Sequence, residues 1–129
     1  MSGTFAAVFA AIVLSGVAVF QLLLAAGVPW GRYAWGGTYE VLPTRLRRSS
    51  LVAVLIYTLA AAIILSRAGV VAIITDARIT RIGIWVLVVL FGIGVIMNAL
   101  SRSKGERLWV PVVFLLSVLC FVVARSEPR

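Results

Sequence analysis

The sequence contains no histidine and only one cysteine, Cys120. Histidine is the commonest metal ligand and the usual general base near neutral pH, so its absence counts against histidine-bound metals, histidine-ligated haem and most acid–base catalysis. A single cysteine forms no disulfide within the chain and offers no thiol pair for redox chemistry. Cys120 stands in an apolar run, where a cysteine is usually inert. We therefore expect neither a metal nor a cofactor.

Acidic residues are also scarce, with four Asp and Glu against twelve Lys and Arg. None of the four lies within a long apolar run. A proton-coupled antiporter of the small multidrug type needs a membrane-embedded carboxylate as its proton site, so this transporter class is disfavoured. The sequence also lacks a P-loop and the GxGxxG and GxSxG motifs, and the glycines of FGIG at 91–94 lie inside an apolar run. An enzyme is therefore the less expected outcome.

Apolar sequence is abundant: 63% of the residues are hydrophobic and 12% are charged. Soluble domains are about half apolar and about a quarter charged. Runs of about 20 apolar residues suffice to cross a bilayer as a helix. The chain therefore predicts an all-α membrane protein, a four-transmembrane-helix bundle in a single domain, 1–129, with both termini on the same side of the membrane. The predicted spans are about 4–27, 46–67, 82–100 and 108–124.

The first run carries no charge before Arg32, which favours a retained helix over a signal peptide. The second helix is expected to start at Pro43-Thr44, with Thr44 as its cap. It is expected to end near Gly69, because glycine commonly follows the last helical turn. The apolar segment 70–74 is too short to cross a membrane; it either extends this helix or lies in the interface. The polar segment that follows, TDARITR, reads as a turn.

Small and polar residues in the spans predict helix contacts. Ala7, Ala11 and Ser15 recur every four residues, so they share a face where a neighbouring helix can approach closely. Gln21 and Asn98 both lie near the first-loop end of their spans, at the same predicted depth. If this end of the bundle is an ordinary interface, a hydrogen bond between these two side chains would join the helices.

The long polar interruption, VPWGRYAWGGTYEVLPTRLRRSS, holds two of the four Trp residues and four of the eleven Arg residues. Tryptophan and tyrosine favour the headgroup level of a bilayer. The loops 28–49 and 101–107 follow the first and third spans, so they lie on the same side. They form the one candidate pocket, for a ligand or a lipid headgroup, with these residues: Gln21, Trp30, Trp35, Glu40, Arg45, Asn98, Arg102, Glu106, Arg107 and Trp109. The alternative is an ordinary interface of Trp belts, lipid-phosphate contacts and weak Arg–Glu pairs.

Basic residues lie almost wholly between the apolar runs. Seven fall in the loops 28–49 and 101–107 and five on the other side, so the positive-inside rule favours these two loops in the cytoplasm. The expected partners are the lipid bilayer, its anionic headgroups, and a second copy of the chain or a larger membrane complex. No nucleic acid is expected, because the cations form no single face on a soluble domain.

Three segments carry a resemblance: PWGRYAWGG, the VLPTRLR that follows it, and MNALSRSKGERLWVPV at 97–112. They resemble segments of small, uncharacterised bacterial integral membrane proteins with four predicted spans. The resemblance implies a four-helix membrane protein. The expected location is the bacterial cytoplasmic membrane, as a multi-pass protein. It implies no activity and assigns no functional residue.

Three hypotheses follow for the function. The first is a non-enzymatic accessory or oligomerising membrane subunit, suggested by the small-residue faces and the shortage of catalytic groups. The second is a small transporter, channel or lipid-binding protein with its pocket at the end formed by loops 28–49 and 101–107. The third is an enzyme acting on lipid headgroups, with Glu40 or Glu106 as acid or base and arginines holding phosphate.

Overall fold

The computed structural model describes residues 2–126, and all of its regular structure in this range is helical. Four helices are long and apolar enough to cross a membrane, the last of them counted together with a short preceding turn. This confirms the predicted fold class of an all-α, four-span protein. The helices are α1 (Gly3–Ala25), α2 (Thr44–Arg67), α3 (Ala77–Leu100), the short α4 (Lys104–Arg107) and α5 (Val110–Arg125), with two 3-10 turns, η1 (Gly31–Tyr33) and η2 (Trp35–Gly37), between α1 and α2.

The helix boundaries differ from the prediction most at α3, which begins five residues earlier than expected. The Asp76 side chain accepts hydrogen bonds from the backbone amides of Arg78, at 2.9 Å, and Ile79, at 3.4 Å. An aspartate in this position satisfies amides that otherwise lack a partner at a helix start. The segment 77–81 is therefore the first turn of α3, and reading it as a polar turn was wrong.

At α2 the predicted cap was also wrong, because Thr44 lies inside the helix and the preceding Pro43 offers no side-chain hydrogen bond. The far end is as expected: α2 stops at Arg67, and Gly69 has a φ of +76°. A left-handed residue here redirects the chain, so the segment 70–74 does not extend α2. It forms an irregular turn in which the Ile74 amide donates to Ser66 Oγ at 3.1 Å.

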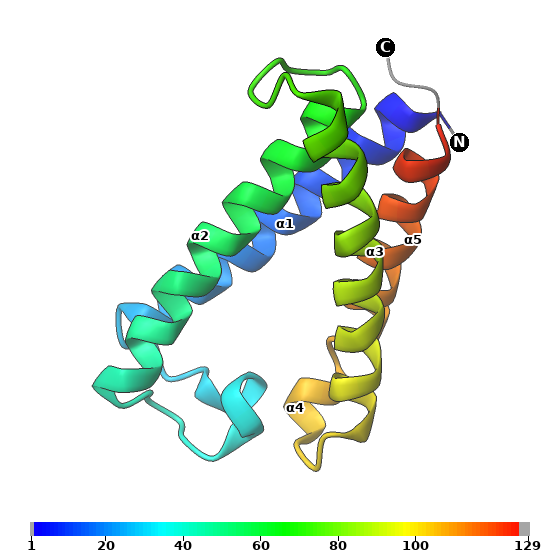
Figure 1. Ribbon diagram of the computed structural model, residues 1–129. Helices are drawn as coiled ribbons and strands as arrows, with labels where there is room; N and C mark the ends of the chain where they lie inside the picture. The colour runs from blue at the N-terminus through cyan, green and yellow to red at the C-terminus, as the bar shows by residue number, and fades with distance from the viewer. Residues whose placement is uncertain (1, 127–129) are drawn as a thin grey trace.

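The four long helices form two antiparallel pairs, α1 with α2 and α3 with α5 (Figure 1). The pairs meet at the end where α1 begins and α5 ends, and they diverge towards the end that carries α4. At the narrow end the first and last described turns touch, since a Cβ on Gly3 would lie 2.7 Å from Ser126 Cβ. Which side of a membrane this end faces stays a prediction.

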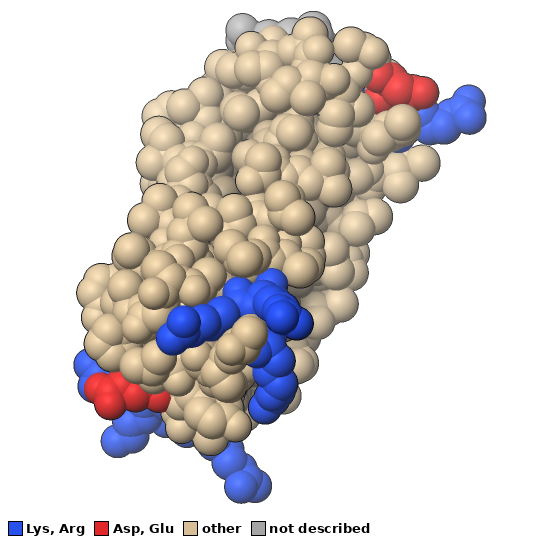
Figure 2. All heavy atoms as spheres, turned by 90° about the vertical axis from the view of Figure 1, so that its left-hand side faces the viewer, with Lys and Arg blue, Asp and Glu red and all other residues tan. Residues whose placement is uncertain are grey.

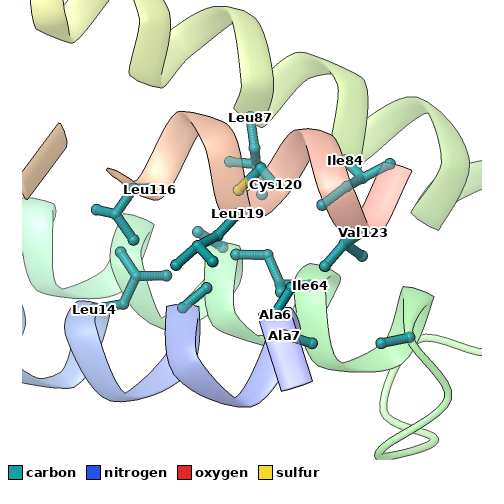
Figure 3. Close-up of a cluster of buried hydrophobic side chains, with 13 residues drawn as sticks. Ala6, Ala7, Leu14, Ile64, Ile84, Leu87, Leu116, Leu119, Cys120 and Val123 are labelled. Carbon is teal, nitrogen blue, oxygen red and sulfur yellow. The ribbon is translucent and has the colours of Figure 1, made fainter. Parts of the chain in front are cut away.

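The apolar core fills the narrow end, where the pairs cross (Figure 3). Three fully buried alanines of α1 lie there against larger side chains of α2, α3 and α5. Small residues allow helix backbones to approach closely, which lipid-embedded helices need because apolar burial alone gains little there. The core comprises Ala6, Ala7, Ala10, Leu14, Ala60, Ile64, Ala68, Ile84, Leu87, Leu116, Leu119, Cys120 and Val123.

The predicted small-residue face on α1 was only partly right. Ala7 is buried, but Ala11 is half-buried and Ser15 is exposed, with its Oγ donating to the Ala11 carbonyl at 2.8 Å. The buried stripe runs instead through Ala6, Ala10 and Leu14. The small residues of α1 therefore serve contacts within the chain.

Charge is concentrated at the wide end of the bundle, where the helix pairs diverge and α4 lies. Figure 2, which views the molecule from the left-hand side of Figure 1, shows most Lys and Arg side chains over the lower half and a broad uncharged surface above. A smaller charged group lies near the opposite end. This distribution is that of a membrane protein whose middle faces hydrocarbon.

Candidate functional site

The first loop, which we define as residues 26–43, folds back tightly beneath the helix pairs. Trp35, Gly36 and Gly37 all have positive φ angles, of 52°, 83° and 73°. The Gly31 amide donates to the Glu40 carbonyl at 2.7 Å, which closes the loop on itself. Left-handed backbone is strained for a tryptophan. Trp35 is held in it by its indole Nε1, which donates to Ser50 Oγ at 3.0 Å.

The first loop also contacts α4 and the start of α5, far along the chain. Ser103 Oγ donates to the Arg32 carbonyl at 3.0 Å, and the Trp109 indole Nε1 donates to the Tyr33 carbonyl at 2.8 Å. Gly105 approaches the Arg32 carbonyl so closely that an added Cβ would collide with it. The first loop and α4 together form what we call the loop layer, so the two predicted loops do meet at one end of the bundle.

A cavity of about 360 Å³ lies between the helix pairs, next to the loop layer. This volume falls in the range of small-ligand pockets, which run from about 300 to 1,000 Å³. Apolar side chains dominate the lining, and all four long helices contribute to it. The lining residues are Val17, Phe20, Gln21, Tyr33, Ala34, Trp35, Ile56, Tyr57, Ala60, Leu87, Leu90, Phe91, Gly94, Asn98, Glu106, Trp109, Val112, Val113 and Leu116.

The cavity opens sideways, between α2 and α3. Its lining includes Ile56 of α2 and Leu90 of α3, whose side chains are 54% and 53% exposed. These are the two helices whose pairs diverge towards the loop layer in Figure 1. Ile56 lies twelve residues along α2, which is about 18 Å at 1.5 Å per residue. The opening therefore reaches the middle of the membrane-spanning region, where the hydrocarbon chains of lipids would lie.

Gln21 is the most deeply buried polar side chain of this cavity, at 8% exposed. Its Oε1 atom is fully buried and finds no hydrogen-bond partner among the described residues. The hydrogen bond that would join Gln21 to Asn98 in an ordinary interface is absent, because Asn98 Nδ2 donates instead to the Gly94 carbonyl of its own helix at 2.8 Å. Leaving a buried polar atom unpaired costs about 1–3 kcal/mol, which a bound hydroxyl or amide donor would offset.

Glu106 also lines the cavity, but hydrogen bonds at the start of α4 hold it. Its Oε1 accepts from Ser101 Oγ at 2.7 Å, and its backbone amide donates to Ser103 Oγ at 3.3 Å. Ser103 and Glu106 stand three residues apart, in the spacing of a capping box. The carboxylate therefore has a structural role in shaping the turn before α5.

The structure divides the ten predicted pocket residues evenly. Gln21, Trp35, Asn98, Glu106 and Trp109 line the cavity. Arg102 lies in a separate groove on the loop layer. The remaining four, Trp30, Glu40, Arg45 and Arg107, line neither space, and Glu40 contributes only its backbone carbonyl, to the first loop.

Several lining residues were not predicted, chiefly Tyr33, Tyr57, Phe91 and Gly94. A tyrosine in the middle of a span was the one available signal, because a phenol in hydrocarbon usually needs a polar partner. The neighbouring Thr58 carries no such meaning, since its Oγ1 donates to the Val54 carbonyl at 2.8 Å on the exposed side of α2.

Comparison of the chain with protein-family models, with curated proteins and with solved structures gives no match. Within residues 2–126, no group of three or more His, Cys, Asp or Glu side chains is placed to hold a metal ion. The function must therefore be inferred from the geometry of the cavity and the loop layer.

Changing Trp109 to phenylalanine should weaken the attachment of the loop layer. The substitution removes the donor to the Tyr33 carbonyl while leaving an aromatic ring to pack on Phe20, whose ring centroid lies 5.0 Å away. We expect a loss of about 1–2 kcal/mol in the free energy of unfolding, measured in mixed micelles. The control is Trp85→Phe, because Trp85 packs edge-on against Phe121 on the outer surface. Equal losses in the two variants would contradict the role of the hydrogen bond.

Proposed function

We propose that this multi-pass membrane protein binds an amphiphilic ligand in the cavity between α2 and α3. The observation that carries the proposal is the unpaired Oε1 of Gln21, buried in an apolar cavity that opens towards the hydrocarbon. A ligand that enters from the side of the bilayer needs no path through water. Of the three functions expected from the sequence, this proposal corresponds to the second, a lipid-binding protein with its pocket near the loops.

The cavity favours a ligand with a particular chemistry. Its apolar walls suit a hydrocarbon chain or ring of the ligand. Gln21 Oε1 can accept a hydrogen bond from a hydroxyl or amide group next to that chain or ring. In pockets of this kind a few polar groups set the orientation while apolar contacts supply most of the affinity. Asn98 and Tyr57 are the other polar side chains within the membrane-spanning part of the lining.

We place the protein in the cytoplasmic membrane of a bacterium, on the strength of its four spans and its resemblance to small bacterial proteins of this type. The excess of basic residues in loops 28–49 and 101–107 favours a cytoplasmic loop layer in contact with anionic headgroups.

An oligomerising subunit is the second candidate. The outer face of α3 carries a row of exposed apolar side chains, among them Ile82, Trp85, Val86 and Val89, beside a shallow groove. A second copy of the chain would bury this row, although lipid chains cover such faces as well. Native mass spectrometry distinguishes the candidates, since a dimer mass supports the subunit and a monomer with a lipid-sized addition supports the binding protein.

The direct test replaces Gln21 with leucine in the full chain, purified gently from its own membrane. We expect the ratio of ligand-bound to ligand-free protein, measured by native mass spectrometry, to fall about tenfold, because one hydrogen bond of about 1.4 kcal/mol is lost. The ligand-free variant should be more stable than the ligand-free wild type by about 1 kcal/mol, because the unpaired oxygen is gone.

Thr58→Val is the matched control for this test. It also removes a polar group from the middle of a span, but Thr58 is exposed and lies outside the cavity lining. Its ligand occupancy should equal that of the wild type. An unchanged occupancy in Gln21→Leu would refute the proposed function.

A further inference from the structure

The loop layer carries a second space, a groove that runs between the first loop and α4. Three basic residues line it, Arg32, Arg102 and Lys104, and its lining includes no Asp or Glu. Like charges that share a groove repel one another, and no carboxylate in the lining offsets them here. An anion in the groove would remove this repulsion.

Two glycines allow the first loop and α4, the two sides of this groove, to lie close together. A Cβ added to Gly37 would collide with Ser103 Oγ, and one added to Gly105 would collide with the Arg32 carbonyl. The close approach brings the basic residue of the first loop beside the two that precede and begin α4. The clustering of cations is therefore imposed by the backbone packing of the two loops.

Tyr33 lies between the groove and the cavity, because it lines both. Arg32 is fixed at the same point: its Nη2 donates to the Tyr33 hydroxyl at 2.8 Å, and its guanidinium carbon lies 4.8 Å from the centre of the Tyr33 ring. A cation over an aromatic face is attracted to the ring. One side chain thus separates an apolar space open to hydrocarbon from a cationic space at the level of the headgroups.

We propose that the groove binds the phosphate of an anionic phospholipid whose hydrocarbon chain occupies the cavity between α2 and α3. The inference rests on the proposed function and names the class of its ligand. Arginine guanidinium groups form paired, charge-assisted hydrogen bonds with phosphate oxygens, and lysine adds a point charge. The Gln21 oxygen then orients the part of the lipid that carries a hydroxyl or amide hydrogen.

The test measures lipid preference by native mass spectrometry of the full chain. Phosphatidylglycerol and phosphatidylcholine with identical acyl chains are offered in equal amounts. We expect the wild type to prefer phosphatidylglycerol by about tenfold or more, since each basic residue near an anionic headgroup favours binding about fivefold. The variant with Arg32→Gln, Arg102→Gln and Lys104→Gln should lose this preference. The control with Arg45→Gln, Arg48→Gln and Arg107→Gln removes as much charge outside the groove and should keep most of it.

Two further arms complete the design. A double variant, Arg102→Gln with Lys104→Gln, keeps the contact between Arg32 and Tyr33, so it reports on the groove even where the triple variant fails to fold. Its preference should fall between those of the wild type and the triple variant. Water-soluble glycerol phosphate should not displace the lipid at equal concentration; displacement would overturn the lipid as the source of the phosphate.

The outcomes separate this inference from the proposed function. If Gln21→Leu lowers retention of both lipids while the triple variant still prefers phosphatidylglycerol, the groove proposal is wrong and the cavity proposal stands. If the triple variant loses its preference while Gln21→Leu changes nothing, the cavity proposal is wrong and the groove binds headgroups alone. A wild type without preference for phosphatidylglycerol also overturns the inference.

Discussion

Replacing Leu119 by alanine should lower the free energy of unfolding by about 1–3 kcal/mol. Leu119 is 0% exposed, and it lies where the two helix pairs cross, among Ile64, Ile84 and Val123 (Figure 3). In lipid or detergent the unfolded helices remain in an apolar medium, so the transfer of the side chain contributes little. The cost arises because the side chains around the new void forfeit their dispersion attraction to the leucine. It should be measured by equilibrium unfolding of the purified protein in mixed micelles.

Leu55→Ala is the control, since Leu55 is a leucine of α2 that is 70% exposed. Its side chain touches lipid or detergent in both the folded and the unfolded state. The same substitution there should change stability by less than about 0.5 kcal/mol. A large difference between the two variants is the expected result, and equal losses would mean that the helix pairs do not cross at Leu119.

Gly31→Ala should detach the first loop and, with it, one wall of the cavity. A Cβ at this position would collide with the carbonyl of Tyr39 and lie 2.8 Å from that of Glu40. Backbone atoms cannot swing aside as a side chain does, so the loop must open and lose the hydrogen bond from the Gly31 amide to Glu40. Overpacking of this kind costs about 1–3 kcal/mol. The free energy of ligand binding should fall by more than the free energy of unfolding, because Tyr33, Ala34 and Trp35 of this loop all line the cavity.

Limited trypsin digestion measures the opening of the loop at Arg32. Cleavage there should be about tenfold faster in Gly31→Ala than in the wild type. Each loss of about 1.4 kcal/mol in the stability of the closed loop raises the population of the open loop tenfold. The control is Gly16→Ala, since nothing lies within 4 Å of a Cβ at Gly16 in α1. That variant should be as resistant as the wild type, and equal cleavage of both variants would contradict the packing described for Gly31.

The cavity shows which features of a helix bundle a sequence determines. Gln21 and Asn98 were placed at one depth because connectivity and helix rise set that depth, and both line the cavity. Whether they touch depends on the angle between the helix pairs, which the pattern of apolar residues does not encode. The pairs diverge, so Asn98 bonds to Gly94 and the oxygen of Gln21 stays unpaired among the residues described.

The positions of the loop arginines are a second feature that the sequence does not determine. Loop membership predicted that Arg45, Arg102 and Arg107 would share a pocket, but only Arg102 lies in the groove with Arg32 and Lys104. A loop residue is placed by the turns around it, here by two glycines that admit a close backbone approach. No periodicity signals such an approach, because it joins two loops that lie far apart along the chain.

The sequence by itself determined that the chain forms four helices long and apolar enough to cross a membrane and that its first and third loops share one end. Apolar runs and connectivity suffice for both, since each span must satisfy its own backbone hydrogen bonds within the bilayer. The tertiary structure decided where the alanines of α1 pack, how the pairs diverge, and hence that a cavity exists beside Gln21. These features depend on interactions between distant residues, such as Trp109 with the Tyr33 carbonyl, which only the packed bundle brings together.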